Sequence, residues 1–285
     1  MTGKHYLIII LITFLFGSSY PVGKLIFNNS VPPLLMGSLR MFLVLIILAP
    51  FTKITIPEKK YWVPLIGFGL FMGFATNVFL NYSIYVADIL SPTIIGTQLS
   101  IPFGILFGSF FLNEKVTIKK WTLIIVCFLG IILIAFDPNL KNEKLALILA
   151  IGMSFFYGGT QVFSRYLKDL NIILTNVFMA LIGFILLLFF SILFEGNIIA
   201  NIKEVDIASW VLIAHSAIFI SIISHMSLFY LYKTYSVQKV FPFYALFPIF
   251  GILQTMVIFN EIPTLIIIIG GLIVITSIYL LNRLD

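Results

Sequence analysis

Ten long apolar runs constrain the fold of this chain more than any other feature of its sequence. Nine of them contain no Asp, Glu, Lys or Arg, and the tenth is interrupted only by Arg40. An α-helix needs about 20 apolar residues to cross the hydrocarbon core of a bilayer. The shortest run can be extended because Lys120 can snorkel toward the interface. The predicted spans are 5–23, 25–52, 61–87, 89–113, 121–136, 145–164, 170–194, 207–232, 240–260 and 262–282.

The composition excludes a soluble fold. Of the 285 residues, 61% are hydrophobic and only 10% are charged, whereas a soluble domain carries roughly 25% charged residues. The runs also lack the two-residue alternation that is typical of a membrane β-barrel. We therefore expect an all-α integral membrane protein of ten transmembrane helices. A turn at Asp88, with Ser91 and Pro92, should separate the third span from the fourth, and the short connections leave no room for an extramembrane catalytic domain.

Lys and Arg are distributed unequally between the two sets of connecting segments. Twelve lie on the side that carries both termini, four lie on the other side, and Arg40 lies inside a span. The positive-inside rule then predicts a multi-pass protein of the cytoplasmic membrane with both termini in the cytoplasm. The net charge of +6 follows from this bias, so the lipid bilayer is the expected partner and no nucleic acid is expected. The single Cys127 excludes a disulfide framework and a cysteine-based metal cluster.

The sequence repeats itself at two similar offsets. At an offset of 141, residues 17–24 of the first span align with residues 158–165 of the sixth. At an offset of 147, Asn113-Glu114-x-x-Thr117 aligns with Asn260-Glu261-x-x-Thr264. Matches between Leu and Ile follow from composition alone, but these polar and glycine matches carry more weight.

Each copy contains five spans, an odd number, so the second copy enters the membrane from the opposite side. The predicted domains are 1–137 and 138–285. Inverted repeats of this kind are typical of secondary transporters, whose substrate site lies near the bilayer midplane between the two halves.

Four motifs stand out along the chain. They are Leu99-Ser100-Ile101-Pro102 through Asn113-Glu114-Lys115-Val116-Thr117, the copy Leu246-Phe247-Pro248 through Glu261-Ile262-Pro263-Thr264, Phe16-Gly17-Ser18-Ser19 and Ser38-Leu39-Arg40. Together they resemble a known family, the EamA-type drug/metabolite transporter superfamily, over nearly the whole chain. The resemblance implies ten helices in two inverted five-helix repeats, both termini inside, and export or exchange of metabolites, commonly amino acids. It does not identify the substrate.

Polar side chains concentrate on spans 1, 3, 4, 6, 8 and 9. We expect these spans to wall a cavity for a small neutral or zwitterionic solute. For any single residue, the alternative is a hydrogen bond between helices. Spans 5, 7 and 10 are nearly bare, and a homo-oligomer through spans 5 and 10 is a hypothesis. The candidate substrate-binding residues are Tyr20, Asn77, Asn81, Gln98, Ser100, Tyr157, Gln161, His225 and Tyr244.

Charged residues inside or beside the spans form a second group of candidates. Arg40 could bind a substrate carboxylate through a bidentate contact. The alternative, favoured by its place in a superfamily-wide motif, is that it snorkels toward the interface or ties helix ends together through backbone carbonyls. Lys24, Glu114, Arg165 and Glu261 lie at span ends and are predicted to cap helices or anchor loops.

No Asp or Glu lies deep in a span, so a proton-coupled mechanism would have to use His225 or His215. The alternative is that His225 only packs against a neighbouring helix. We therefore expect movement driven by the gradient of a small-molecule substrate or by exchange.

The spans carry no catalytic motif and no nucleotide-binding loop. We expect a secondary transporter with no enzymatic activity, no cofactor and no metal. The alternative functions are a structural or assembly membrane protein and a passive channel, although neither a re-entrant filter nor a ring of like charge is present in the sequence.

Overall fold

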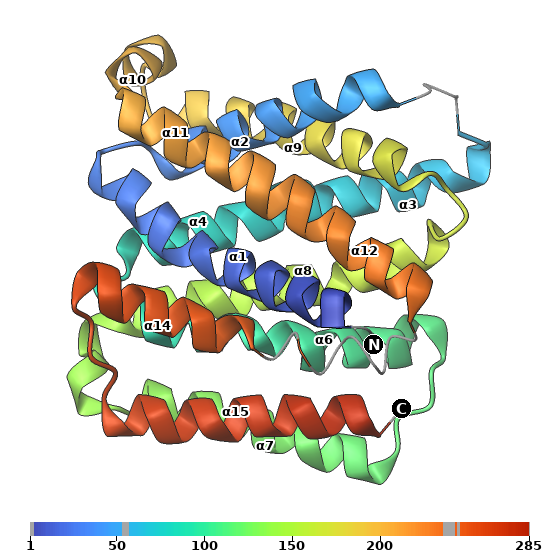
Figure 1. Ribbon diagram of the computed structural model, residues 1–285, viewed down its shortest axis with the longest axis vertical. Helices are drawn as coiled ribbons and strands as arrows, with labels where there is room; N and C mark the ends of the chain where they lie inside the picture. The colour runs from blue at the N-terminus through green and yellow to red at the C-terminus, as the bar shows by residue number, and fades with distance from the viewer. Residues whose placement is uncertain (1–2, 53–56, 236–242, 244–245, 285) are drawn as a thin grey trace.

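The computed structural model describes residues 3–52, 57–235, 243 and 246–284. Within these ranges the regular structure is entirely helical (Figure 1). Nine helices of the described part are long and apolar enough to cross a membrane, and a tenth apolar helix, Phe247–Phe259, is shorter. The predicted all-α fold of ten membrane helices is therefore confirmed.

The helices of the first half follow the predicted spans closely. The third and fourth spans are each built from several consecutive helical segments. In chain order, the elements are α1 (Gly3–Asn28), α2 (Pro33–Leu48), η1 (Ala49–Phe51), η2 (Lys59–Tyr61), α3 (Trp62–Phe68), η3 (Gly69–Ala75), α4 (Thr76–Val86), α5 (Leu90–Gly96), η4 (Thr97–Leu99), α6 (Ser100–Leu112) and α7 (Ile118–Ala135).

The second half repeats this pattern. Its third span is again built from several helical segments, one of them a π-helix. The elements are η5 (Pro138–Glu143), α8 (Lys144–Tyr166), α9 (Ile172–Phe194), α10 (Ile198–Glu204), α11 (Ile207–His215), η6 (Ser216–Ser224), α12 (His225–Thr234), α14 (Phe247–Phe259) and α15 (Leu265–Arg283).

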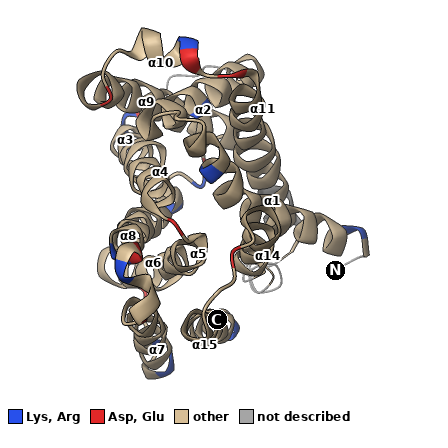
Figure 2. Ribbon diagram, turned by 90° about the vertical axis from the view of Figure 1, so that its left-hand side faces the viewer, with Lys and Arg blue, Asp and Glu red and all other residues tan. Residues whose placement is uncertain are grey.

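The long helices run side by side across the view of Figure 1. There α2 packs on α9 at one end of the molecule, and α7 packs on α15 at the other. Between these pairs, α1 packs on α14 and α6 packs on α8. Figure 2 looks along the helices and shows that charged residues are few and lie mainly in the connections and at helix ends.

Two glycine contacts interlock the first half of the chain with the second. A Cβ atom on Gly17 of α1 would lie 2.7 Å from the backbone nitrogen of Gly251 in α14. A Cβ atom on Gly158 of α8 would lie 2.8 Å from the backbone nitrogen of Gly104 in α6. Small residues allow membrane helices to approach this closely. The first span of each half therefore packs against the fourth span of the other half.

The two Asn-Glu-x-x-Thr motifs form equivalent connections between helices. Asn113 and Asn260 end α6 and α14 in the left-handed conformation, each with a φ of 55°. Asparagine adopts this conformation more readily than most residues. Thr117 and Thr264 then cap α7 and α15 by accepting a hydrogen bond from a backbone N–H three residues later. The motif thus reverses the chain between two spans.

Three features differ from the sequence-based expectations. The segment 195–206, which lies between two predicted spans, contains α10, which Asn197 caps by accepting from two backbone N–H groups. The third and eighth spans contain the π-helices η3 and η6, which start 147 residues apart. The chain breaks at 87–89, and Ser91 and Pro92 lie in the first turn of α5, where proline is tolerated because its missing N–H is not needed.

Candidate substrate-binding site

Tyr20 is the best-connected member of the predicted cavity set. It lies on α1, is 3% exposed, and its hydroxyl lies 2.6 Å from that of Thr97 in η4. Because Thr97 donates its own proton to the Ile94 carbonyl, Tyr20 is the donor in this pair. The Tyr20 ring stacks on Phe247 of α14, with centroids 6.4 Å apart. Three elements, α1, η4 and α14, therefore meet at Tyr20, and Tyr157 of α8 lies within electrostatic range of it.

Gln98 and Ser100 follow Thr97 along the chain and are also buried. Gln98 is 1% exposed, and its Nε2 has no hydrogen-bond partner. A buried amide with an unmade hydrogen bond is destabilising unless a ligand or water completes it. This part of the fourth span therefore offers an unused donor next to the residue that binds Tyr20.

His225 follows the π-helix η6 directly. Its Nδ1 lies 3.1 Å from the Ile220 carbonyl, five residues earlier, and its ring packs edge-to-face on Phe16 of α1 at 5.0 Å. An Nδ1–H donated to a carbonyl is the geometry of a hydrogen-bonded packing histidine. His225 also lies within electrostatic reach of Arg40.

Asn77 and Asn81 use their amide groups on backbone carbonyls. The Nδ2 atom of Asn77 donates to the carbonyls of Met72 and Gly73, at 2.9 Å each, within the π-helix η3. The Nδ2 atom of Asn81 donates to the Pro33 carbonyl at 3.0 Å. Their donors thus hold η3 in shape and tie α4 to α2.

Two further members of the predicted set are Gln161 and Tyr244. Gln161 is exposed on α8, where its side chain faces Gly104 of α6. Tyr244 lies outside the described residues. Of the nine predicted residues, Tyr157 lies within electrostatic range of Tyr20, and Gln98 directly follows Thr97, the hydrogen-bond partner of Tyr20.

Arg40 lies near the middle of α2 and is 8% exposed. Its Nε has no hydrogen-bond partner. Among the described residues, the recorded ion pairs are Lys60 with Glu58 and Arg165 with Glu114, so neither involves Arg40. Among the described residues, no backbone carbonyl accepts a hydrogen bond from this Nε.

Three charged side chains hold the connection between α4 and α5, and we call Lys24, Glu143 and Glu261 the α4–α5 clamp. Lys24 Nζ donates to the Ala87 carbonyl and, at 3.3 Å, to that of Tyr85. Glu143 accepts from the Asp88 N–H at 3.2 Å.

Glu261 completes the clamp at the start of α5. Its carboxylate accepts from the backbone N–H groups of Leu90 and Ser91 at 2.9 and 2.8 Å. The clamp therefore satisfies carbonyls at the end of one helix and N–H groups at the start of the next. Sequence reasoning missed Glu143, which lies among the polar residues of a connecting segment and carries no motif.

The counterparts of Lys24 and Glu261 in the repeat are Arg165 and Glu114, and they pair with each other instead. Their nearest N···O distance is 3.2 Å, and their side chains are 66% and 43% exposed. They line a surface pocket of about 560 Å³ together with Lys60, Tyr61 and Lys168. The connection after α12, which corresponds to the α4–α5 connection, lies outside the described residues.

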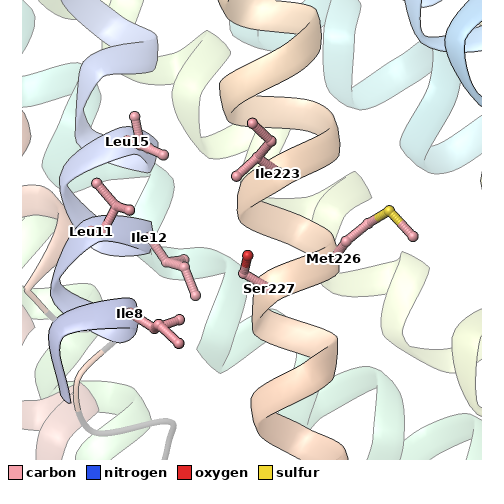
Figure 3. A pocket seen from close by; sticks show the side chains of 7 residues that line it. All are labelled: Ile8, Leu11, Ile12, Leu15, Ile223, Met226 and Ser227. Carbon is pink, nitrogen blue, oxygen red and sulfur yellow. The ribbon is translucent and has the colours of Figure 1, made fainter. Parts of the chain in front are cut away.

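A second pocket, of about 280 Å³, lies between α1 and η6–α12. Figure 3 shows that Ile223 and Ser227 point toward α1, whereas Met226 points away from it. Ser227 supplies the hydroxyl in a lining that is otherwise Ile, Leu and Met. The α1 residues of this pocket belong to the N-terminal half of the helix. Along the helix axes, the pocket therefore lies on the side opposite the α4–α5 connection (Figure 1).

Comparison with known proteins identifies the family. A sequence model of the EamA-like transporter family matches residues 3–136 and again residues 144–283. The chain belongs to this family. The chain is also 29% identical, over 203 residues and 68% of each sequence, to a Bacillus subtilis (strain 168) protein named uncharacterized transporter YoaV. One crystal structure of a protein with 17% sequence identity matches 100% of both chains with a TM-score of 0.65, which supports the fold alone.

Proposed function

We propose that this EamA-like protein is a secondary transporter that moves a small metabolite, such as an amino acid, across the cytoplasmic membrane by alternating access. We further propose that it is not an enzyme and that it works as an exporter or exchanger. The polar residues around Tyr20, where spans of both halves meet, are the proposed substrate contacts. The family membership supports transport, and the arrangement of the spans supports the mechanism.

The observation that carries the mechanism is the asymmetry between equivalent residues of the two halves. Lys24 and Glu261 hold the α4–α5 connection through backbone hydrogen bonds. Arg165 and Glu114 instead pair with each other at an exposed pocket. In a carrier built from inverted repeats, the two halves exchange their arrangements when the substrate site opens to the other side of the membrane. We infer that the described state is closed on the side of the membrane where the α4–α5 clamp lies.

Flux through the purified protein in proteoliposomes tests this proposal. Vesicles loaded with an unlabelled amino acid should take up the same labelled amino acid faster than empty vesicles. The internal amino acid binds the carrier, and the occupied carrier then returns its site to the outer face of the vesicle. A panel of amino acids would be tested one by one. A passive channel would show equal uptake with and without internal solute, and an assembly protein would show none.

A variant of the clamp connects the flux to the structure. Lys24→Met should change the ratio of counterflow to net uptake, because the closed state loses a hydrogen-bonded cap. Lys203→Met, on the exposed α10, is the matched control and should behave like the parent protein. An unchanged ratio in Lys24→Met would remove the clamp from the mechanism.

A further inference from the structure

Arg40 places a full positive charge deep among apolar helices. It lies about 10 Å along α2 from Pro33 at 1.5 Å per residue, and its side chain is almost completely buried. A guanidinium stays charged in proteins and offers five N–H donors in a planar fork. At membrane depth such a group is costly unless it is paired.

The described part of the chain supplies no partner for this charge. The Nε atom makes no hydrogen bond, and the buried carboxylate of Glu143 is used at the α4–α5 connection. Asp137 is likewise bonded to Thr264 and Asn139. An arginine kept for packing would donate to carbonyls at helix ends, as Lys24 does. Within the described residues, the unpartnered Nε therefore leaves room for a group that arrives with the solute.

The surroundings of Arg40 show what kind of group fits. Its electrostatic neighbour His225 already has its Nδ1 at the Ile220 carbonyl. The His225 ring contacts Phe16, and Tyr20 lies one helical turn further along α1 against Phe247. The charge of Arg40 thus lies within electrostatic range of a histidine that packs on an aromatic ring of α1. A single negative charge balances one guanidinium, whereas a phosphate dianion would leave an uncompensated charge in the membrane.

We propose that Arg40 binds the carboxylate of the transported solute, so that the substrates are small carboxylic acids, with or without an amino group. The carboxylate accepts two parallel N–H···O bonds from the guanidinium, the geometry that arginine favours. The apolar part of the solute packs on the aromatic rings of α1 and α14. This inference rests on the proposed transport function, but the binding step can be measured separately.

Thermal unfolding of the purified protein tests binding with two matched series of compounds. The first is L-leucine, isocaproate and isoamylamine, and the second is L-phenylalanine, hydrocinnamate and phenethylamine. Within each series the compounds carry both groups, the carboxylate only, or the amine only. We expect at least one carboxylate compound to raise the Tm and both amines to leave it unchanged. Stabilisation by L-leucine or L-phenylalanine alone identifies amino acids, and stabilisation by the amine-free acids identifies organic acids.

Two variants complete the test. Arg40→Gln should raise the ligand concentration needed for half of the Tm increase at least about tenfold. The bound carboxylate would lose its charged partner, and such a loss weakens binding strongly. Arg283→Gln, at the exposed end of α15, is the matched control and should bind like the parent. Without ligand, Arg40→Gln should keep or raise the Tm, because it removes an unpaired buried charge. A lower ligand-free Tm would show a structural arginine and overturn the proposal.

The outcomes separate this inference from the proposed function. Carboxylate-dependent stabilisation without any uptake in vesicles would reject the transport proposal and leave the binding site standing. Uptake that Arg40→Gln does not weaken, or that amines inhibit as well as acids do, would reject the Arg40 site and leave transport standing. No Tm increase with any of the four carboxylate compounds also rejects the site.

Discussion

Glu261 accepts two hydrogen bonds from Ser91, one from its backbone N–H at 2.8 Å and one from its hydroxyl at 2.6 Å. The two residues belong to different halves of the chain and lie at the ends of different spans. A carboxylate at the N-terminus of a helix satisfies N–H groups that have no partner within the helix. Glu261 is therefore expected to contribute to stability more than a typical residue of a short connection.

Removing this carboxylate should destabilise the protein. Glu261→Ala should lower the free energy of unfolding by roughly 1–2 kcal/mol, as for other lost N-terminal caps. Its repeat counterpart, Glu114→Ala, breaks only an exposed ion pair and should cost less than about 1 kcal/mol. Unfolding by SDS in mixed micelles measures both. Equal losses would show that Glu261 has no special role at α5.

The glycine contact between α1 and α14 gives an asymmetric prediction. Gly17→Ala would place a Cβ atom 2.7 Å from a backbone nitrogen, so the helices must separate, at a cost of roughly 1–3 kcal/mol. Gly251→Ala meets its nearest atom at 3.4 Å and should be tolerated. The two variants can be compared by thermal unfolding. A larger loss in Gly251→Ala would contradict the described packing.

Asp137 should make stability depend on pH in the acid range. Burial alone raises the pKa of Asp137, but hydrogen bonds from Thr264 and Asn139 outweigh burial and hold this pKa below its ordinary value. A depressed pKa stabilises the folded state above the unfolded pKa of about 3.9, and this contribution is lost as the pH falls through the folded pKa. The Tm difference between the parent and Asp137→Asn should therefore be constant near neutral pH and shrink in acid. A difference that persists unchanged into acid would contradict this role.

The membrane orientation can be tested by cysteine labelling. In a protein with Cys127 replaced by alanine, cysteines at Lys141 and Lys203 should react with an impermeant reagent added to intact cells. Cysteines at Lys59 and Lys119 should not react, because the excess of Lys and Arg places them in the cytoplasm. All four positions are exposed, so burial cannot explain a negative result. Labelling at Lys59 alone would reverse the topology.

His225 gives a prediction about the driving force. Its Nδ1 is already directed at the Ile220 carbonyl, so we expect uptake to be independent of an imposed pH gradient in the parent and in His225→Gln. Uptake with and without the gradient measures this. A gradient response that disappears in His225→Gln would instead establish His225 as a proton-linked group.

The number and order of the helices could be predicted because a membrane helix carries its signal within its own residues. Long charge-free runs define each span, and short polar motifs mark where α6 and α14 end. The break near Asp88 was placed within a few residues for the same reason. These features depend on local sequence and on the thickness of the bilayer, and need no knowledge of distant contacts.

The polar contacts could be predicted only in part, because they depend on which helices meet. Tyr20 belongs to the predicted set because it is a polar residue within a span, but its partner Thr97 does not belong to that set. The Asn77 amide donates to carbonyls of the π-helix η3, and no sequence signal predicted that wider turn. Glu195, at the end of α9, was likewise missed, although it accepts from the N–H groups of Leu34 and Leu35 at 2.7 and 2.9 Å.

The contact between Gly17 and Gly251 also has a consequence for biosynthesis. The first span enters the membrane early, but the helix that fits its glycine surface is made only when the ninth span is synthesised. At typical translation rates of about 5–20 residues per second, the delay is on the order of tens of seconds. During that time α1 must remain inserted with lipid in place of its partner. The interlocked halves can therefore close only near the end of translation, and a chain truncated before α14 would leave its first helix without its closest neighbour.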